Sequence, residues 1–322
     1  MSLTHPAKRV LVTGGAGFIG HHLTRALLGR GLAVTVLDDL SMGRRENVPA
    51  AARFVAGDIR DARALGEALD GVDAVFHQAA VVSIRASVEH FVRDAEVNLM
   101  GTLALLREIA TRRIPRAVLA SSMAVYADSP RPEPLSETAP TVPISPYGVA
   151  KLAAERYWLL LGAQAGVTAT ALRYFNTYGP NQTPTPYVGV ITIFIERLLA
   201  GAPLRIFGDG EQARDFVHVD DIVAANLAVL DAPAASVAGR VFNVGTGHAT
   251  SVNEIAAALI HALAPGTQPE YLPAQPGEMR NAIADASAIR TALGWTPRHV
   301  PPEFSAVIAF WREGAKAGRH PR

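Results

Sequence analysis

The sequence predicts an α/β fold, a doubly wound parallel sheet followed by a smaller α/β domain at the C-terminal end. Short apolar runs of the kind that form buried strands alternate with helical patterns, which is typical of a parallel sheet covered by helices on both faces. With 322 residues, 49% of them apolar, the chain can bury a large core. Near the end, residues 251–254 form a capping box before an apolar helix, which supports the second domain.

The first strand and helix enclose a glycine-rich turn. Residues 9–12 are expected to form a buried strand, residues 13–20 follow with the sequence TGGAGFIG, and a helical pattern continues from His22. The three spaced glycines allow a tight bend, close approach of the backbone to a pyrophosphate and close packing of helix on sheet, and the helix N-terminus faces the anion. This pattern predicts a Rossmann-like dinucleotide site, with cofactor contacts from Gly14, Gly17, Phe18, Ile19 and Gly20.

The second strand indicates which dinucleotide binds. Residues 33–37 form an apolar strand that ends at Asp38, at about the separation where an acid binds the adenosine ribose. A carboxylate there would repel a 2′-phosphate, so Asp38 favours NAD over NADP. Arg44 and Arg45 follow in a loop, where they either hold such a phosphate or are solvated surface.

A third strand also ends at an acid. Residues 54–57 form this strand, and Asp58 and Ile59 follow it. We expect both residues to contact the cofactor, with Asp58 meeting the adenine amine. The alternative for Asp58 is a cap for the next helix.

A set of three residues in the middle of the chain indicates the chemistry. Tyr147 and Lys151 stand four positions apart at the start of an Ala-rich helical pattern, and Ser122 ends an apolar strand-like run. Positions i and i+4 share a helix face, so the Lys151 ammonium can sit beside the Tyr147 phenol and favour the phenolate. Making tyrosine a base at neutral pH needs a pKa shift of roughly three units, about 4 kcal/mol, which one lysine and a cationic cofactor can supply. Taken alone, the pair also fits a surface helix.

Composition argues against several other classes of protein. The formal net charge is +1 and basic residues form only short pairs, so we expect no nucleic-acid partner. No apolar run approaches a membrane span and the first strand leaves no room for a secretory segment, so the expected location is the cytoplasm. Without cysteine there is no disulfide, thiolate metal site or cysteine nucleophile. The ten histidines show no metal spacing, so we expect no metal.

Taken together, these residues resemble the extended short-chain dehydrogenase/reductase family, most of all its NAD-dependent nucleotide-sugar epimerases and dehydratases of the UDP-galactose 4-epimerase type. The resemblance covers nearly the whole chain. Besides the glycine turn, Ser122 and the Tyr–Lys pair, it rests on Asn98 and on the segments 76–80, 173–176, 214–216 and 242–245.

The resemblance implies roles for these residues. Tyr147 would be the catalytic base, Lys151 would lower its pKa and hold the nicotinamide ribose, and Ser122 would bond the reacting sugar hydroxyl. The cofactor would be NAD. Further residues implied to contact it are Ala79, Ala80, Asn98 and Tyr174.

Two side chains beside Ser122 narrow the reaction. Related 4,6-dehydratases carry an Asp-Glu pair just after the catalytic hydroxyl, and related decarboxylases usually carry Glu there, whereas this chain has Met123 and Ala124. Neither residue can exchange a proton, so elimination of water loses its acid and base. The expected reaction is therefore 4-epimerisation, in which the C4 hydroxyl is oxidised to a 4-keto intermediate and hydride returns to the other face.

The C-terminal half is expected to bind the nucleotide. By the resemblance, Asn176 contacts the diphosphate, Arg214 reaches the phosphates, and Ile206 and Phe207 belong to a segment that binds uracil. From the sequence alone, Asn176 is equally a turn residue. Arg214 can instead pair with a neighbouring aspartate.

Four later residues bear on the substrate. Glu278 fits a family acid that binds the uridine ribose. Gln275 departs from the family pattern, which often has a phosphate-binding arginine there, and Arg280 is a candidate substitute. Ala282 falls where hexose-only relatives hold a tyrosine, so an N-acetyl group at C2 is expected to fit.

Alternatives remain at this stage. Arg85, Thr177 or Gln182 could bind a carboxylate, which leaves a UDP-glucuronate 4-epimerase open. Another nucleotide-sugar oxidoreductase would turn over added NAD. A non-catalytic NAD-binding sensor is the rival from another class, although such proteins typically lack the Tyr or the Lys.

The resemblance also implies an organisation for the chain. Residues 1–175 would form the NAD-binding domain, with a later segment of about 215–245 returning to it, and residues 176–322 would bind the nucleotide sugar. The helices near 98–106 and 147–161 resemble the face through which such proteins form a homodimer as a four-helix bundle.

Overall fold

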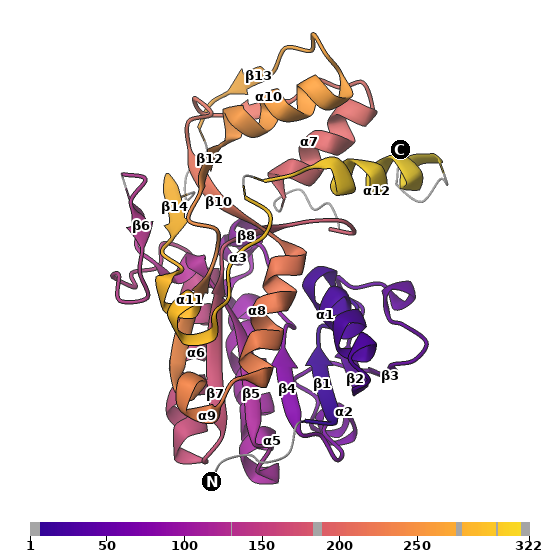
Figure 1. The fold of residues 1–322 in the computed structure, drawn as a ribbon, viewed down its shortest axis with the longest axis vertical. Coiled ribbons are helices and arrows are strands. Elements are labelled where there is room, and N and C mark those ends of the chain that lie inside the picture. The colour runs from indigo at the N-terminus through magenta and orange to yellow at the C-terminus, as the bar shows by residue number, and fades with distance from the viewer. Residues whose placement is uncertain (1–6, 130, 183–188, 275–278, 301, 317–322) are drawn as a thin grey trace.

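A seven-stranded parallel sheet forms the centre of the larger lobe (Figure 1). The computed structural model describes residues 7–129, 131–182, 189–274, 279–300 and 302–316. Neighbouring strands follow the order β11-β7-β5-β4-β1-β2-β3, and every pairing is parallel. The strands are β1 (Arg9–Thr13), β2 (Ala33–Asp38), β3 (Arg53–Ala56), β4 (Ala74–His77), β5 (Arg116–Ser122), β7 (Thr168–Tyr174) and β11 (Arg240–Val244).

Helices cover both faces of this sheet because its strands are apolar on both sides. In β1, Val10 and Val12 belong to one buried cluster and Leu11 to the other. The predicted doubly wound sheet is thereby confirmed. On the first face lie α1 (Phe18–Gly29), α8 (Val219–Asp231), α9 (Ala234–Val237) and α11 (Ser287–Leu293), and on the second α2 (Ala62–Ala68), α5 (Thr102–Arg112) and α6 (Pro146–Gln164).

A second, smaller sheet begins the upper lobe in Figure 1. Its central strand β10 (Ala213–His218) pairs in parallel with β8 and β14 and antiparallel with β12. A third buried cluster joins the helices of this lobe. The remaining elements here are β6 (Pro134–Leu135), β8 (Asn176–Tyr178), α7 (Val190–Leu199), β9 (Arg205–Phe207), β12 (Ala249–Ser251), α10 (Val252–Leu263), β13 (Glu270–Leu272), β14 (Asn281–Ala284) and α12 (Ser305–Lys316).

The chain passes between the lobes in both directions. After β10 it returns to the large sheet through α8 and β11, the segment expected to do so, and α11 later packs on β11. In the opposite direction, β6 leaves the first half of the chain to pair with β14. Both halves of the chain therefore contribute strands to both lobes, and a single boundary near residue 175 does not separate the lobes.

Two local predictions for the smaller lobe are confirmed. Ser251 and Glu254 form the capping box: the Ser251 hydroxyl accepts from the Glu254 N–H at 3.1 Å, and the Glu254 carboxylate accepts from the Ser251 N–H at 2.7 Å. The apolar stripe of α7 is core, since Ile191, Phe194 and Ile195 are buried.

Short helices connect β4 to α5 beside the carboxyl ends of the strands. They are α3 (Ile84–Glu89), α4 (Phe91–Ala95) and the π-helical turn η2 (Glu96–Gly101). The 3₁₀ turns η1 (Arg45–Asn47) and η3 (Met123–Val125) follow β2 and β5. Such wide π turns commonly occur at functional sites.

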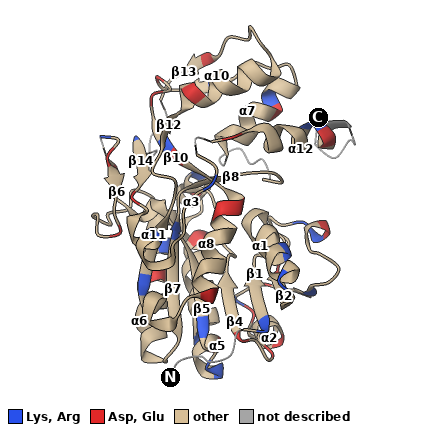
Figure 2. Ribbon diagram, in the orientation of Figure 1, with Lys and Arg blue, Asp and Glu red and all other residues tan. Residues whose placement is uncertain are grey.

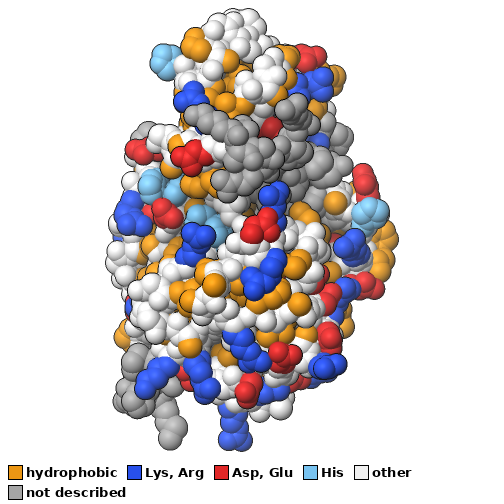
Figure 3. Space-filling model, turned by 90° about the vertical axis from the view of Figure 1, so that its right-hand side faces the viewer, with side chains coloured by type: hydrophobic (Ala, Val, Ile, Leu, Met, Phe, Trp, Pro, Cys, Tyr) orange, Lys and Arg blue, Asp and Glu red, His pale blue; other side chains and the backbone are white. Residues whose placement is uncertain are grey.

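The charges are spread evenly over the molecule. Acidic and basic residues are interspersed on the ribbon in Figure 2 and on the face shown in Figure 3, as the balanced composition leads one to expect. No helix within the described residues is long and apolar enough to cross a membrane.

His77, at the end of β4, is buried and locked in one hydrogen-bonded arrangement. The Thr102 hydroxyl donates to the Asn98 carbonyl at 2.7 Å, so Thr102 accepts from Nε2–H of His77 at 2.9 Å. Nδ1 is then unprotonated and accepts from the Thr13 hydroxyl at 2.7 Å. Burial lowers the pKa of His77 to about 3, so the folded protein holds this ring neutral.

This histidine should make stability depend on pH. Its folded pKa lies below its unfolded value near 6.5, so stability is fully present above that value and is lost as pH falls toward 3. We expect His77 to account for about 2 kcal/mol of the stability lost between pH 8 and pH 5, measured by urea unfolding, with His21, whose pKa burial lowers to about 4, adding its own share. His77→Asn should flatten this pH dependence, whereas the exposed control His261→Gln should keep it. An unchanged slope in His77→Asn would refute the assignment.

Candidate active site

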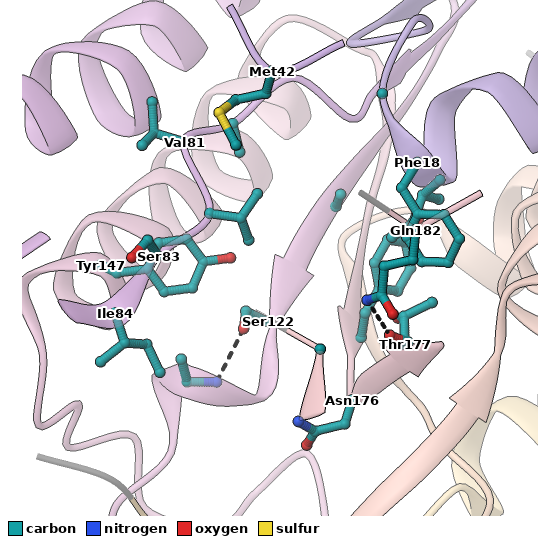
Figure 4. Close-up of a pocket in the computed structure, with 18 of the residues that line it drawn as sticks. Phe18, Met42, Val81, Ser83, Ile84, Ser122, Tyr147, Asn176, Thr177 and Gln182 are labelled. Atoms are coloured by element: carbon teal, nitrogen blue, oxygen red, sulfur yellow. Dashed lines mark hydrogen bonds between the residues drawn. The ribbon is translucent and has the colours of Figure 1, made fainter. Parts of the chain in front are cut away.

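A cavity of about 640 Å³ opens at the carboxyl ends of the large sheet and continues under the smaller lobe. It lies where the strand order reverses between β1 and β4, the point at which open parallel sheets bind ligands. Figure 4 shows Tyr147 and Ser83 on one side of it, Phe18 and Gln182 on the other, and Ser122 between them.

The glycine turn forms the floor of the cavity and fits a dinucleotide. Gly14 has φ +69°, and a Cβ there would lie 2.7 Å from the Ala79 nitrogen, so only glycine is accommodated. The N-terminus of α1 begins after Gly17, without a side-chain cap, and is open to an anion. The turn residues predicted to contact the cofactor all line the cavity: Gly14, Gly17, Phe18, Ile19 and Gly20.

Gly20 offers a test of this turn. A Cβ on Gly20 would overlap the Gly14 carbonyl, which is backbone and cannot move aside. Gly20→Ala should therefore cost about 1–3 kcal/mol of unfolding free energy and weaken NAD binding, measured by urea unfolding and NAD titration. Gly29→Ala in the same helix is the control, because nothing lies within 4 Å of that position. Equal behaviour of the two variants would contradict the geometry.

Two acids follow the glycine turn around the cavity. Asp38 accepts the Ala16 N–H at 2.9 Å and the Leu40 N–H at 2.8 Å, which fixes its carboxylate at the cavity wall. Asp58 lines the wall and pairs with Arg60 at 2.7 Å, which holds its pKa below the usual range. The helix-cap alternative for Asp58 is wrong, because Asp61 caps α2.

Ser122, Tyr147 and Lys151 come together on the cavity wall, as the sequence predicted. Ser145 caps α6 through the Gly148 N–H at 3.1 Å, and so starts the helix that carries Tyr147 and Lys151. The Ser122 oxygen accepts the Ala124 N–H at 3.1 Å, which orients it.

Burial controls the protonation of the Tyr–Lys pair. It raises the pKa of Tyr147 to about 12, although the Ser122 hydroxyl opposes this rise. It also lowers the pKa of Lys151 to about 8, against the charges of Asp94 and Glu155. In the protein chain without a cofactor, desolvation sets the direction of the Tyr147 pKa, which agrees with the expectation that Lys151 acts together with a cationic cofactor. Lowering it requires further positive charge.

Of the other residues expected to contact the cofactor, all but one line the cavity. The Tyr174 hydroxyl accepts from Asn226 at 2.7 Å and Gln78 at 3.1 Å. Asn98 instead lies behind the wall, where its side-chain amide is hydrogen-bonded to the Val81 backbone. Its Oδ1 accepts from the Val81 N–H and its Nδ2 donates to the Val81 carbonyl, both at 2.9 Å. The residues at the wall are Ile59, Ala79, Ala80 and Tyr174.

The predicted nucleotide-binding residues occupy the far end of the cavity. Asn176 starts β8 at the wall, and its buried Oδ1 has no hydrogen-bond partner among the described residues, which fits a polar ligand. Ile206 and Phe207, on β9, also line the wall. Arg214 lines it as well and donates to the main-chain carbonyls of Ala213, Met279 and Arg280.

Other substrate-binding predictions do not hold in this structure. Ala282 lies on β14, and its short side chain is completely buried in the core. It therefore does not line the cavity. Arg280 forms an exposed bidentate pair with Asp209, at 2.8 and 3.1 Å, away from the wall. Gln275 and Glu278 lie outside the described residues.

Gln182 has a structural task that the sequence did not reveal. Its Nε2 donates to the Thr177 carbonyl at 3.0 Å and its Oε1 accepts from Thr192 at 2.9 Å, so it ties β8 to α7. Arg85 lines the cavity and lies over the Phe207 ring, 5.7 Å from its centre.

A histidine grouping also escaped the sequence reasoning. His218, Asp220 and His299 bring potential ligand atoms within 4.8 Å of one another, from segments about 80 residues apart. The spacing of histidines along the chain carries no signal for it. The Asp220 N–H donates to Nδ1 of His218 at 3.2 Å, so the ring caps α8.

A Rossmann-like sheet, a glycine turn and a Ser–Tyr–Lys wall define a dinucleotide-dependent enzyme. The chain belongs to the NAD dependent epimerase/dehydratase family, whose model matches residues 10–245. NAD is accordingly its cofactor.

Relatives of known name cover almost the whole chain. UDP-glucose 4-epimerase of Mycolicibacterium smegmatis is 38% identical over 311 residues, which span 94% of this chain and 98% of that protein. The crystal structure of UDP-glucose 4-epimerase from Thermotoga maritima with UDP-glucose has a TM-score of 0.91 at 36% identity and covers 95% and 99% of the two chains. UDP-N-acetylglucosamine 4-epimerase from Methanobrevibacter ruminantium, in complex with UDP-N-acetylmuramic acid, has a TM-score of 0.89 at 32% identity and covers 96% and 99%.

Proposed function

We propose that this protein is a 4-epimerase of a UDP-sugar, acting on UDP-glucose and UDP-galactose, on their N-acetylated counterparts, or on both pairs. The observation that carries the proposal is the convergence of Ser122, Tyr147 and Lys151 on one wall, beside two side chains that cannot exchange a proton, Met123 and Ala124. Dehydration and decarboxylation lack their acid and base there.

The residues divide the proton chemistry among themselves. Bound NAD supplies the site that accepts hydride from C4 and gives it back. Tyr147 takes the proton of the C4 hydroxyl and later returns it, Ser122 holds that oxygen, and the Lys151 ammonium stabilises the phenolate. The positive charge of the oxidised nicotinamide would lower the raised pKa of Tyr147. No net redox change results.

The nucleotide end of the cavity supports a UDP-sugar. Asn176, Ile206, Phe207 and Arg214 line that end, where the first and last would bind the diphosphate and the other two would form an apolar edge for the base. Ala282 lies outside the cavity wall and does not support acceptance of an N-acetyl group. The support for it is the similarity to the Methanobrevibacter enzyme.

The direct test is product analysis. The purified protein, without added cofactor, is incubated separately with UDP-glucose, UDP-N-acetylglucosamine and UDP-glucuronate, and products are separated and weighed by mass spectrometry. We expect a new peak of unchanged mass with one of the first two. Epimerisation of UDP-glucuronate alone would replace the proposal with the glucuronate alternative, for which Arg85 is one candidate cation on the cavity wall. Loss of water or carbon dioxide, or net reduction of added NAD, would overturn it.

We also infer a homodimer located in the cytoplasm. Large apolar side chains are exposed along α3, α4, η2 and α6, and exposed apolar surface of this kind marks a contact with another protein chain. Light scattering should give twice the chain mass, and Leu160→Glu should give the monomer; a monomeric wild type would contradict the inference. The exposed residues are Val88, Phe91, Val92, Met100, Val149, Tyr157 and Leu160.

A further inference from the structure

Lys151 is a buried cation whose charge needs support. It is 4% exposed, and burial brings its pKa down to about 8. Two carboxylates raise that pKa, Asp94 from α4 and Glu155 from one turn further along α6. His77, on β4, also faces Lys151 but is neutral. The two acids differ in how much of their negative charge is available to stabilise the Lys151 ammonium.

Glu155 is already neutralised by another cation. Arg173 donates to both of its carboxylate oxygens, at 2.6 and 3.0 Å, and the pair is buried. The Ser121 hydroxyl adds a further bond at 2.7 Å. A carboxylate so paired has little net field to offer a second cation.

Asp94 has the opposite surroundings. It is 2% exposed, and Oδ1 accepts only from the neutral amide of Asn98, at 2.9 Å. Oδ2 is buried and has no hydrogen-bond partner among the described residues. Burial raises the pKa of Asp94, and the Lys151 ammonium lowers it. Because α4 packs against α6, this carboxylate lies beside the helix that carries Tyr147 and Lys151, and its charge raises the pKa values of both.

The Asp94 carboxylate also helps to hold part of the cavity wall in position. Asn98 sits in the π turn η2, four residues after Asp94, and its amide clamps both polar groups of Val81. Val81 belongs to the segment 79–85 that lines the cavity. With Asp94 holding Nδ2, the Asn98 amide is fixed in the orientation that fits the Val81 backbone.

We propose that Asp94 is a positioning residue of the active site, which serves as the counter-charge of Lys151 and orients the Asn98 clamp on Val81. The role rests on the proposed function. The oxidised nicotinamide would add positive charge to the same wall, so a buried acid beside the lysine helps to keep it an ammonium.

Asp94→Asn isolates the charge. The amide keeps the size of the side chain and an oxygen that accepts from Asn98, but it removes the negative charge. Both pKa values that Asp94 raises should then fall, so the alkaline limb of the kcat–pH profile should move to lower pH by about one unit. The ratio of variant to wild-type kcat should drop about tenfold between neutral and alkaline pH. Glu89→Gln, an equal charge change on the exposed surface of α3, should leave the profile in place.

A second measurement needs no substrate. The phenolate of Tyr147 is titrated by ultraviolet difference absorption in the holoenzyme, with Tyr147→Phe subtracted. In Asp94→Asn the phenolate should form at lower pH than in the wild type, with urea unfolding showing an intact fold. Unchanged titration and an unchanged alkaline limb would overturn the role of Asp94. A shifted titration in a protein that epimerises none of the sugars would instead retain the electrostatic role and sink the proposed function.

Discussion

Tyr147→Phe should lower kcat by about 10²–10⁴-fold while the protein still binds NAD, because the variant keeps the ring but loses the group that exchanges the proton. The surroundings of Tyr147 support a direct role: it is buried at the cavity wall, which Ser122 and Lys151 also line. The measurement is single-turnover and steady-state epimerisation, together with NAD content after gel filtration.

The matched control is Tyr157→Phe, a half-exposed tyrosine on the same helix. It should retain wild-type turnover. If Tyr147→Phe also retained it, the base would have to be another group and the proposed chemistry would fail. If NAD were lost together with activity, the effect would be one of binding and the experiment would have to be repeated at saturating NAD.

Arg173→Met should have the largest effect on stability. It leaves the Glu155 carboxylate buried without its cation, and removing one partner of a buried pair typically costs about 3–5 kcal/mol. Arg173 also donates to the Tyr126 hydroxyl at 2.8 Å and the Glu137 carbonyl at 3.1 Å, so more than one element loosens. Urea unfolding gives the loss of free energy directly.

Two further variants separate the cause. Arg173→Met combined with Glu155→Leu removes both charges and should recover a large part of the loss, because no lone charge stays buried. Arg30→Met breaks an exposed pair with Asp231 of similar length, 2.8 Å, and should cost less than about 1 kcal/mol. A double variant no better than the single one would show that packing, rather than charge, dominates at this site.

Much of the fold could be predicted because its signals are local. The predicted tight glycine turn appears in the structure, where Gly14 has φ +69° and packs against Gln78 and Ala79, just after β4. The strand before Asp38 and the capping box at Ser251 were likewise found where expected. Each depends on residues within one turn or one strand, so periodicity and residue type suffice.

Other expectations failed where long-range packing decides the outcome. Asn98 was expected at the cofactor groove, but the π turn directs its amide to the Val81 backbone. Ala282 was expected at the sugar, but β14 buries it in the core. No one-dimensional pattern encodes which face of a short strand meets a cavity.

The sequence by itself determined the family and the dinucleotide turn and predicted the Ser–Tyr–Lys site, because spacing along one helix or one turn is set by the backbone repeat. Only the tertiary structure decided the electrostatics. Asp94 and Glu155 are both acids near Lys151, but Glu155 is paired with Arg173 and Asp94 is not. This difference arises because β7 brings Arg173 to α6, whereas α4 brings Asp94 there. Burial likewise raised the pKa of Tyr147, an effect that the sequence did not show, because desolvation depends on everything that surrounds a group.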